Sequence, residues 1–167
     1  MTTIKLRPWT MDDLQSLVKY ANDYSIARYM TDMFPHPYTL ADGERFINMA
    51  SQANPTNVFA IEVAGEAVGS IGIFPQADIM RKNAEMGYWL AAPFRGKGIV
   101  LQAIQEMVEH GFKTYDITRI YARPYGSNKA SQRVLEKAGF TLEARIAQNI
   151  IKYGEWEDEL IYAVRLG

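Results

Sequence analysis

The sequence contains no cysteine in its 167 residues. This absence excludes disulfide bonds, thiolate metal ligands and a cysteine nucleophile, and we expect no metal site. No apolar run is long enough to cross a bilayer, and no signal peptide precedes Thr2. Together these absences predict a soluble, cytoplasmic protein with no membrane partner.

An excess of charge of one sign is also missing. The chain has 18 basic and 19 acidic residues and a formal net charge of −1, so no global field attracts nucleic acid or acidic lipid. Internal repeats, low-complexity tracts and linkers are absent as well. Because 167 residues are enough to bury a proper core, we predict a single domain over residues 1–167.

The most informative stretch begins at residues 84–91, a short, apolar and aromatic-rich segment that is typical of a buried strand. Pro93 ends this strand because proline has no N–H for the ladder. The loop Arg95-Gly-Lys-Gly98 follows. Apolar residues then recur at helical spacing: Ile99, Val100, Ala103, Ile104, Met107, Val108 and Phe112.

This junction of strand, basic glycine loop and helix is suited to an anion. The first helical turn leaves N–H groups unpaired at the positive end of the helix dipole. Gly96 and Gly98 allow positive φ and a close backbone approach, and Arg95 and Lys97 add formal charge. The combination predicts a pyrophosphate site, although it matches neither the Walker A nor the dinucleotide fingerprint. The same unit also occurs in proteins with no ligand there.

The rest of the chain predicts one mixed domain of helices and strands. We expect helices at residues 10–22, at 39–53 with Leu40 facing inward, and from a cap at Ser127 to residue 138. Gly139-Phe140 has the Schellman pattern that ends a helix. Strands are expected at residues 4–7, 58–63, 67–74, 119–123, 140–151 and 157–166.

Two stretches resemble motifs of the GNAT superfamily of acyl-CoA-dependent N-acetyltransferases. Arg95-Gly-Lys-Gly98-Ile-Val100 is similar to motif A, with Val100 where a small residue is usual. The stretch from Asn128-Lys-Ala-Ser131 to Gly139-Phe140 is similar to motif B. From the residues alone, Asn128 in a first helical turn is more often a cap than a ligand. The two motifs occur in the family's order.

The resemblance implies a fold and a cosubstrate. The fold is α/β (α+β), with a mixed, mostly antiparallel central sheet of about six to seven strands, flanked by about four helices and splayed at the central strand. The cosubstrate is acetyl-CoA. The residues implied to bind it are Tyr88, Trp89, Leu90, Arg95, Gly96, Lys97, Gly98, Ile99, Val100, Asn128 and Ser131.

Further similarities favour one branch of the superfamily. Leu135 stands where many relatives place a tyrosine that protonates the leaving thiolate, and Ser131 stands where the ribosomal-protein N-terminal (alanine) acetyltransferases have a serine. The aromatic segment at residues 24–38 and the end of the chain also look like that branch. The resemblance therefore implies that Ser131 assists the thiolate. It also implies an acceptor wall formed by Tyr29, Phe34, His36 and Tyr38.

The implied reaction is direct transfer of an acetyl group to a primary amine, because no cysteine can carry the group. A backbone N–H near Tyr88 to Leu90 would stabilise the oxyanion. Glu85 is the best candidate base, since histone-acetylating relatives keep a glutamate there, and a salt-bridged strand-end carboxylate is an equal alternative. His36 and His110 are weaker candidates, and we expect His110 on an exposed helix face.

The sequence leaves the acceptor open among a protein N-terminus, a polyamine, an aminoglycoside and an amino acid. It also leaves open a non-catalytic acyl-CoA-binding module and a protein-interaction scaffold on the same fold, since Val100 and Leu135 depart from the motifs of active relatives. We expect a monomer or a homodimer.

Overall fold

The computed structural model describes residues 2–167. Seven strands follow the order β1-β2-β3-β4-β5-β7-β6 in one sheet, in which β4–β5 is a parallel pair and β1–β2, β2–β3, β5–β7 and β6–β7 are antiparallel. This confirms the predicted fold class. Two compact units are distinguished. One runs through Gly72 and includes Tyr88–Ala103, and the other comprises Ile73–Gly87 and Ile104–Gly167.

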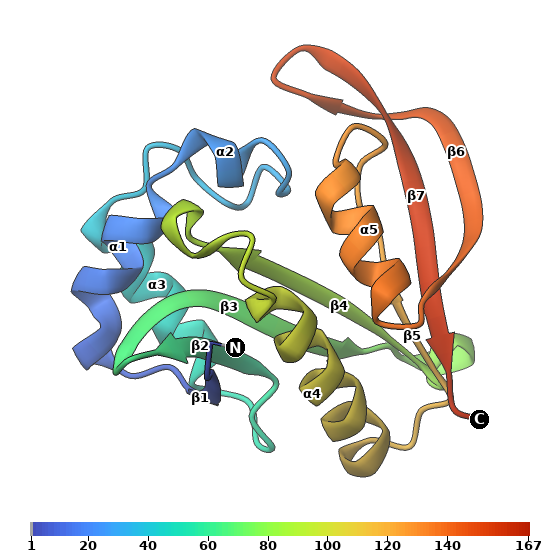
Figure 1. Ribbon diagram of the computed structural model, residues 1–167, viewed down its shortest axis with the longest axis horizontal. Coiled ribbons are helices and arrows are strands. Elements are labelled where there is room, and N and C mark those ends of the chain that lie inside the picture. The colour runs from blue at the N-terminus through green and yellow to red at the C-terminus, as the bar shows by residue number, and fades with distance from the viewer. Residues whose placement is uncertain (1) are drawn as a thin grey trace. The chain divides into compact units, whose positions relative to one another are not determined.

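The first unit carries most of the helices that precede the sheet's central strand (Figure 1). It contains β1 (Lys5–Pro8), the 3-10 turn η1 (Met11–Asp13), α1 (Leu14–Ala21), α2 (Tyr24–Ala27), α3 (Leu40–Ala50), β2 (Val58–Val63) and the first part of β3 (Glu66–Pro75). α1 and α3 approach closely, because a Cβ at Gly43 would lie 2.8 Å from Leu14 Cδ1. The buried core of the unit includes Trp9, Leu17, Ile47, Val58 and Trp89.

The start of α3 corrects one prediction. Thr39 caps the helix: its hydroxyl accepts from the Asp42 N–H at 3.2 Å, and its own N–H donates to the Asp42 carboxylate at 2.8 Å. Leu40 is 50% exposed, so the expectation that it faces inward is wrong. Leu40 is the first residue of α3, whereas the buried residues Ile47 and Ala50 lie further along the helix.

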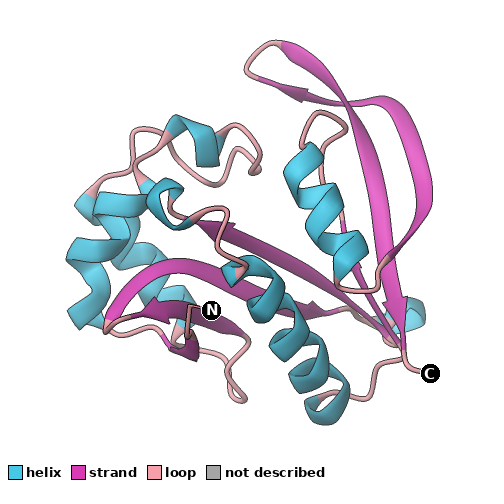
Figure 2. Ribbon diagram, viewed as in Figure 1, coloured by secondary structure: helices cyan, strands magenta, loops and turns pink. Residues whose placement is uncertain are grey.

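The second unit contains the rest of the sheet, two α-helices and the 3-10 turn η2 (Asp78–Met80). It includes β4 (Asn83–Leu90) as far as Gly87, most of α4 (Ile99–Thr114), β5 (Arg119–Ala122), α5 (Lys129–Lys137), β6 (Thr141–Lys152) and β7 (Glu155–Arg165). β6 and β7 form a long hairpin (Figure 2). The parallel ladder between β4 and β5 runs from Asn83–Arg119 to Glu85–Tyr121 and ends there, although β4 itself continues to Leu90.

α5 is capped by a different residue from the one predicted. Asn128 is the N-cap, and its side-chain oxygen accepts from the Ser131 N–H at 3.3 Å. Ser127 instead donates its hydroxyl to Glu157 on β7 at 2.5 Å. The predicted Schellman ending is confirmed: Gly139 has φ +91°, and the Phe140 N–H donates to the Leu135 carbonyl at 3.0 Å.

A charged cluster ties β1 to η1 and β2 in the first unit. Arg7 donates to both carboxylate oxygens of Asp13 at 2.8 Å, and its Nε donates to Glu62 at 2.6 Å. Burial alone would raise the pKa of Asp13, but hydrogen bonds from Arg7 and Thr10 outweigh it and hold the pKa below its ordinary value. The Asp13 carboxylate therefore stabilises the folded state while it is ionised.

We predict that Asp13→Asn lowers the free energy of unfolding by about 2 kcal/mol at neutral pH, because charge-assisted hydrogen bonds from Arg7 are weakened. Since the folded-state pKa is depressed, this contribution is present above the unfolded-state pKa of about 3.9 and is lost as pH falls through the folded-state value. Urea unfolding of both proteins should show the difference at neutral pH and little of it near pH ~2. A difference of equal size at both pH values would contradict the prediction.

Candidate functional site

The loop between β4 and α4 exposes bare backbone in the first unit. After β4 a 3-10 turn, η3 (Ala92–Phe94), leads to extended Arg95. Gly96 and Gly98 then take φ +76° and +75°, and a Cβ built on either would have nothing within 4 Å. Glycine reaches this conformation at no steric cost and leaves the peptide groups open to a ligand. Ile99, 1% exposed, anchors the helix that follows.

The first turn of α4 and the loop side chains concentrate positive charge. The Gln102 N–H is bonded to the Gly98 carbonyl at 3.2 Å, so the N–H groups of residues 99–101 precede the first intrahelical bond and need partners outside the helix. Arg95 and Lys97 lie in the same exposed loop. The Lys97 ammonium is 5.5 Å from the centre of the Phe94 ring. These groups together suit a phosphate or pyrophosphate.

The end of β4 presents backbone groups on the edge away from β3. The Ala91 N–H donates to the Val68 carbonyl of β3 at 2.8 Å. The Leu90 carbonyl, in the same trans peptide, therefore faces the other edge, and Arg95 Nη2 reaches it at 3.4 Å. Because the N–H and C=O of one strand residue face the same edge, the Leu90 N–H also faces away from β3.

The aromatic segment between residues 24 and 38 divides into a buried part and an exposed part. Tyr38 is 5% exposed, and burial raises its pKa to about 12. Phe34 is half-buried and packs 5.3 Å from the Tyr38 ring and 6.1 Å from the Trp89 ring, measured between centroids. Tyr38 is therefore a core side chain that supports Phe34, which corrects its interpretation as part of an open wall.

Other members of the predicted acceptor wall lie nearer the surface. Tyr29 is half-buried, with the Arg28 guanidinium 4.7 Å from its ring centre. His36 is exposed, and its ring centre lies 6.0 Å from that of Tyr24. Of the predicted wall residues, Tyr29 and Phe34 are thus half-buried and His36 is exposed.

In the second unit, Glu85 is an ion-paired strand carboxylate. Its Oε2 lies 3.5 Å from Arg123 Nε, and its side chain is 31% exposed. Tyr121 stands opposite Glu85 in the β4–β5 register. Burial raises the pKa of Tyr121, and the charge of Glu85 raises it further. The structure therefore shows the salt bridge that the sequence left as an alternative to a free base.

The motif B helix places its predicted residues as follows. The Asn128 oxygen caps α5, and Ser131 is half-buried one turn into the helix. Leu135, at 0% exposure, belongs to the core. His110 is half-buried on α4, with Nδ1 3.3 Å from Thr114 Oγ1, so the expectation of an exposed histidine is wrong.

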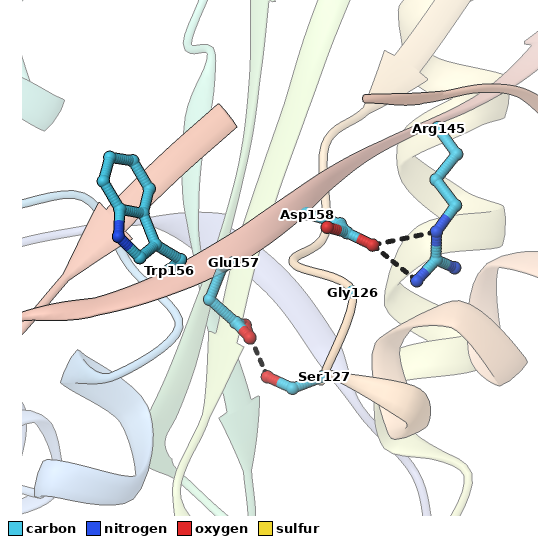
Figure 3. A pocket seen from close by; sticks show the side chains of 6 residues that line it. All are labelled: Gly126, Ser127, Arg145, Trp156, Glu157 and Asp158. Carbon is cyan, nitrogen blue, oxygen red and sulfur yellow. Dashed lines mark hydrogen bonds and ion pairs between the residues drawn. The ribbon is translucent and has the colours of Figure 1, made fainter. Parts of the chain in front are cut away.

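A polar pocket lies beside the start of α5 (Figure 3). It is lined by Gly126, Ser127, Arg145, Trp156, Glu157 and Asp158. Arg145 Nη2 is 2.6 Å from the Asp158 carboxylate, and Ser127 is bonded to Glu157. The ion pair thus joins β6 to β7, and the Ser127–Glu157 hydrogen bond ties the segment before α5 to β7. None of the predicted cofactor or acceptor residues line it.

Sequence reasoning missed Arg123 and Glu159. Arg123 lies 3.4 Å from Glu159 on β7 as well as 3.5 Å from Glu85 on β4. The available signal was alternation: Tyr121 and Arg123 alternate with the buried Ile120 and Ala122, which predicts that both face away from the core. Their partners follow only from strand pairing.

Within residues 2–167, no group of three or more His, Asp or Glu is placed to hold a metal ion. No helix in the same range is long and apolar enough to span a membrane.

Comparison with known proteins identifies the family. Residues 3–141 match the acetyltransferase (GNAT) domain family. A probable N-acetyltransferase of Bacillus subtilis strain 168, YjcK, is 34% identical over 97 residues, which cover 58% of this chain and 54% of that protein. The ribosomal-protein-serine acetyltransferase of Escherichia coli K12 is 30% identical over 115 residues, covering 69% of this chain and 64% of the relative.

Solved structures agree with this match. The microcin C7 self-immunity acetyltransferase MccE, in complex with acetyl-CoA and AMP, is 27% identical with a TM-score of 0.83, and the alignment covers 98% of this chain and 92% of that one. The family match spans far more than half of the residues and includes the glycine loop and α5. The chain therefore belongs to the GNAT family of acetyltransferases.

Proposed function

We propose that residues 1–167 act as one catalytic domain that transfers an acetyl group from acetyl-CoA to the α-amine of a peptide or protein N-terminus. The observation that carries the proposal is the loop Arg95-Gly-Lys-Gly98, with positive φ at both glycines and no Cβ in the way, at the start of α4. Acetyl-CoA carries a pyrophosphate that such a loop is built to hold. The MccE relative was solved with acetyl-CoA.

Each part of the cosubstrate has an assigned partner in this proposal. The N–H groups of Gly96, Gly98 and the first turn of α4 bind the pyrophosphate, with Arg95 and Lys97 adding charge. Asn128 binds the pantetheine arm through its side-chain NH2 group, since the helix cap uses only the Oδ1 atom. The Leu90 N–H, which faces away from β3, donates to the thioester oxygen.

The reaction needs few protein groups. The neutral amine attacks the thioester carbon and forms the C–N bond, while the carbonyl electrons move onto the oxygen and are stabilised by the Leu90 N–H. The oxyanion then collapses and the C–S bond breaks. The thiolate takes a proton from the Ser131 hydroxyl, which regains one from solvent, and the amine gives its excess proton through a water molecule to Glu85, which then releases it to solvent. The products are an amide and free CoA.

The ion pair at Glu85 favours an α-amine over a strongly basic one. An α-amine with a pKa of about 7.7–8.0 is neutral roughly a quarter of the time near pH ~7.4, whereas a lysine-like amine at about 10.4 is neutral ~0.1% of the time. A carboxylate already shared with Arg123 is better suited to the acceptor that needs less deprotonation. The relative from E. coli is named for acetylating a ribosomal protein at serine.

Two kinds of alternative compete with this proposal: a different amine acceptor, and a module that binds acetyl-CoA without catalysis. A polyamine, aminoglycoside or amino acid acceptor would keep the same cofactor loop, and Tyr29, Phe34 and His36 would still line the acceptor side. A non-catalytic acyl-CoA-binding module would bind acetyl-CoA without releasing thiol. Location in the cytoplasm, a monomeric or homodimeric state and the lack of a nucleic-acid partner also stay predictions.

We predict that Gly98→Glu abolishes acetyl-CoA binding by calorimetry, because a carboxylate replaces bare backbone at an anion site. Gly65→Glu is the matched control: Gly65 has φ +85° and an equally open Cβ position, but lies in the β2–β3 turn. The control should share the backbone strain and keep wild-type affinity and thiol release with an N-terminal peptide. A folded Gly98→Glu protein that binds acetyl-CoA normally would refute the assignment of the loop. Binding by wild type with no thiol release for any amine would favour the non-catalytic module.

We predict that two variants of Asn128 separate its cap from its ligand role. Asn128→Ala should lower the free energy of unfolding by about 1 kcal/mol, because α5 loses its N-cap. Asn128→Ser should restore the cap and the stability, since serine caps about as well. If the amide binds the pantetheine arm, both variants should weaken acetyl-CoA binding measured by calorimetry. Full affinity in Asn128→Ser would reduce Asn128 to a cap.

A further inference from the structure

A chain of polar contacts crosses the strands of the second unit and ends at Glu85. Asn149 on β6 donates its amide to Glu159 Oε1 on β7 at 2.7 Å. Glu159 Oε2 lies 3.4 Å from Arg123 Nη1, just past β5. Arg123 Nε in turn lies 3.5 Å from Glu85 Oε2 on β4. Four residues that are far apart in the sequence thus form one connected series.

The backbone brings Arg123 and Glu159 together. β5 pairs with β7 as far as Ala122–Tyr162, and the Leu160 N–H donates to the Pro124 carbonyl at 3.0 Å, so the two segments stay paired beyond β5. The Glu159 side chain is 10% exposed. A carboxylate buried to that extent costs free energy unless it has partners. Arg123 and Asn149 supply them.

A bulge in β6 turns Asn149 toward Glu159. The register with β7 shifts between Ile146 and Ile150, and Gln148 has φ +48° within the shift. A positive φ is strained for a residue with a side chain. The Gln148 N–H donates to Asp158 Oδ1 at 2.9 Å, which holds the bulge. Bulges often re-aim a side chain beside an active site, and this one re-aims Asn149.

The charged and titratable groups that face Glu85 come from β5 and, through Arg123, from β7. Tyr121 stands beside Glu85 in the register and Arg123 follows two residues later. The two ion-pair distances, 3.5 Å to Glu85 and 3.4 Å to Glu159, exceed the ~2.7–2.9 Å of a tight charge-assisted bond. Arg123 is thus shared between two carboxylates, and its position depends on both.

We propose that Asn149, Glu159 and Arg123 form a positioning chain that holds the Glu85 carboxylate where it receives the proton of the acceptor amine. The inference rests on the proposed function of Glu85. Glu159 is its central positioning residue: without its charge, Arg123 loses one of its two carboxylate partners and swings toward solvent, so the Glu85 carboxylate loses its place. Misplacement of a catalytic group by about 1 Å costs up to ~10²-fold in rate.

The kinetic test compares two carboxylates on the same sheet. Glu159→Gln should lower kcat for peptide acetylation by roughly 10- to 100-fold, with the acetyl-CoA KM unchanged. Glu143→Gln is the matched control, since Glu143 also sits between two arginines, Arg119 at 2.9 Å and Arg165 at 3.0 Å. The Glu143 side chain is more exposed, at 29% against 10% for Glu159, and this control should keep its kcat. Equal kcat in wild type and Glu159→Gln, or an equal loss in both variants, would overturn the proposal.

Two further measurements complete the test. Because Asn149 acts through Glu159, the double variant Asn149→Ala/Glu159→Gln should be no slower than Glu159→Gln alone. Additive losses of kcat from the two substitutions would contradict the positioning chain. Exchange of the Arg123 Nε proton with water, followed by NMR, needs no activity. It should speed up in Glu159→Gln and not in Glu143→Gln, and unchanged exchange in both would refute the chain. If the wild-type protein were inactive but the Arg123 Nε exchange changed as expected, the proposed function would be wrong, and the contacts of the positioning chain would still be supported.

Discussion

The N–H groups in the first turn of α4 need partners that the helix cannot supply, and the surrounding structure is arranged around that need. Gly96 and Gly98 turn the chain with positive φ and leave no side chain over the turn. Ile99 and the buried Ile104 and Met107 fix the helix below it. β4 ends at Leu90 and α4 begins at Ile99, so only a few residues separate the Leu90 peptide from the groups that are proposed to bind an anion. The geometry of the proposed reaction follows from that short connection.

The local features of this fold could be predicted from the sequence because they depend on neighbouring residues. The glycine loop, the Schellman ending at Gly139 and the β2–β3 and β6–β7 hairpins are encoded within a few positions, and the structure contains all of them. Family membership was also predictable, since both motifs lie in one continuous part of the chain, and the match over residues 3–141 confirms it. Helix boundaries were less certain, as the move of the α5 cap from Ser127 to Asn128 shows.

Features that depend on long-range pairing could not be predicted. Tyr38 stands in an aromatic run between prolines, and nothing in its neighbourhood indicates that it is buried while Phe34 is half-exposed. The ion pairs of Arg123 with Glu85 and Glu159 require β5 to lie between β4 and β7, an order that no residue spacing encodes. The sequence could therefore name Glu85 as a candidate base, but not the arginine that shares its carboxylate.

The absence of cysteine bears on how the acetyl group is transferred, and the shared Glu85 carboxylate bears on which amine can accept it. Because the sequence has no cysteine that could carry the acetyl group, direct transfer from acetyl-CoA to the amine is favoured over a covalent acetyl-enzyme intermediate. In the proposed reaction the Glu85 carboxylate is shared with Arg123, which suits an acceptor that is neutral for a sizeable fraction of the time. An α-amine, neutral roughly a quarter of the time near pH ~7.4, meets this condition far better than a lysine-like amine.

The proposed function specifies which nitrogen receives the acetyl group. A peptide with a free N-terminus and one internal lysine offers both amines at equal concentration, and tandem mass spectrometry after incubation with acetyl-CoA locates the modification. We predict acetylation at the α-nitrogen, with the lysine unmodified. Acetylation at the lysine ε-nitrogen in preference to the N-terminus would contradict it.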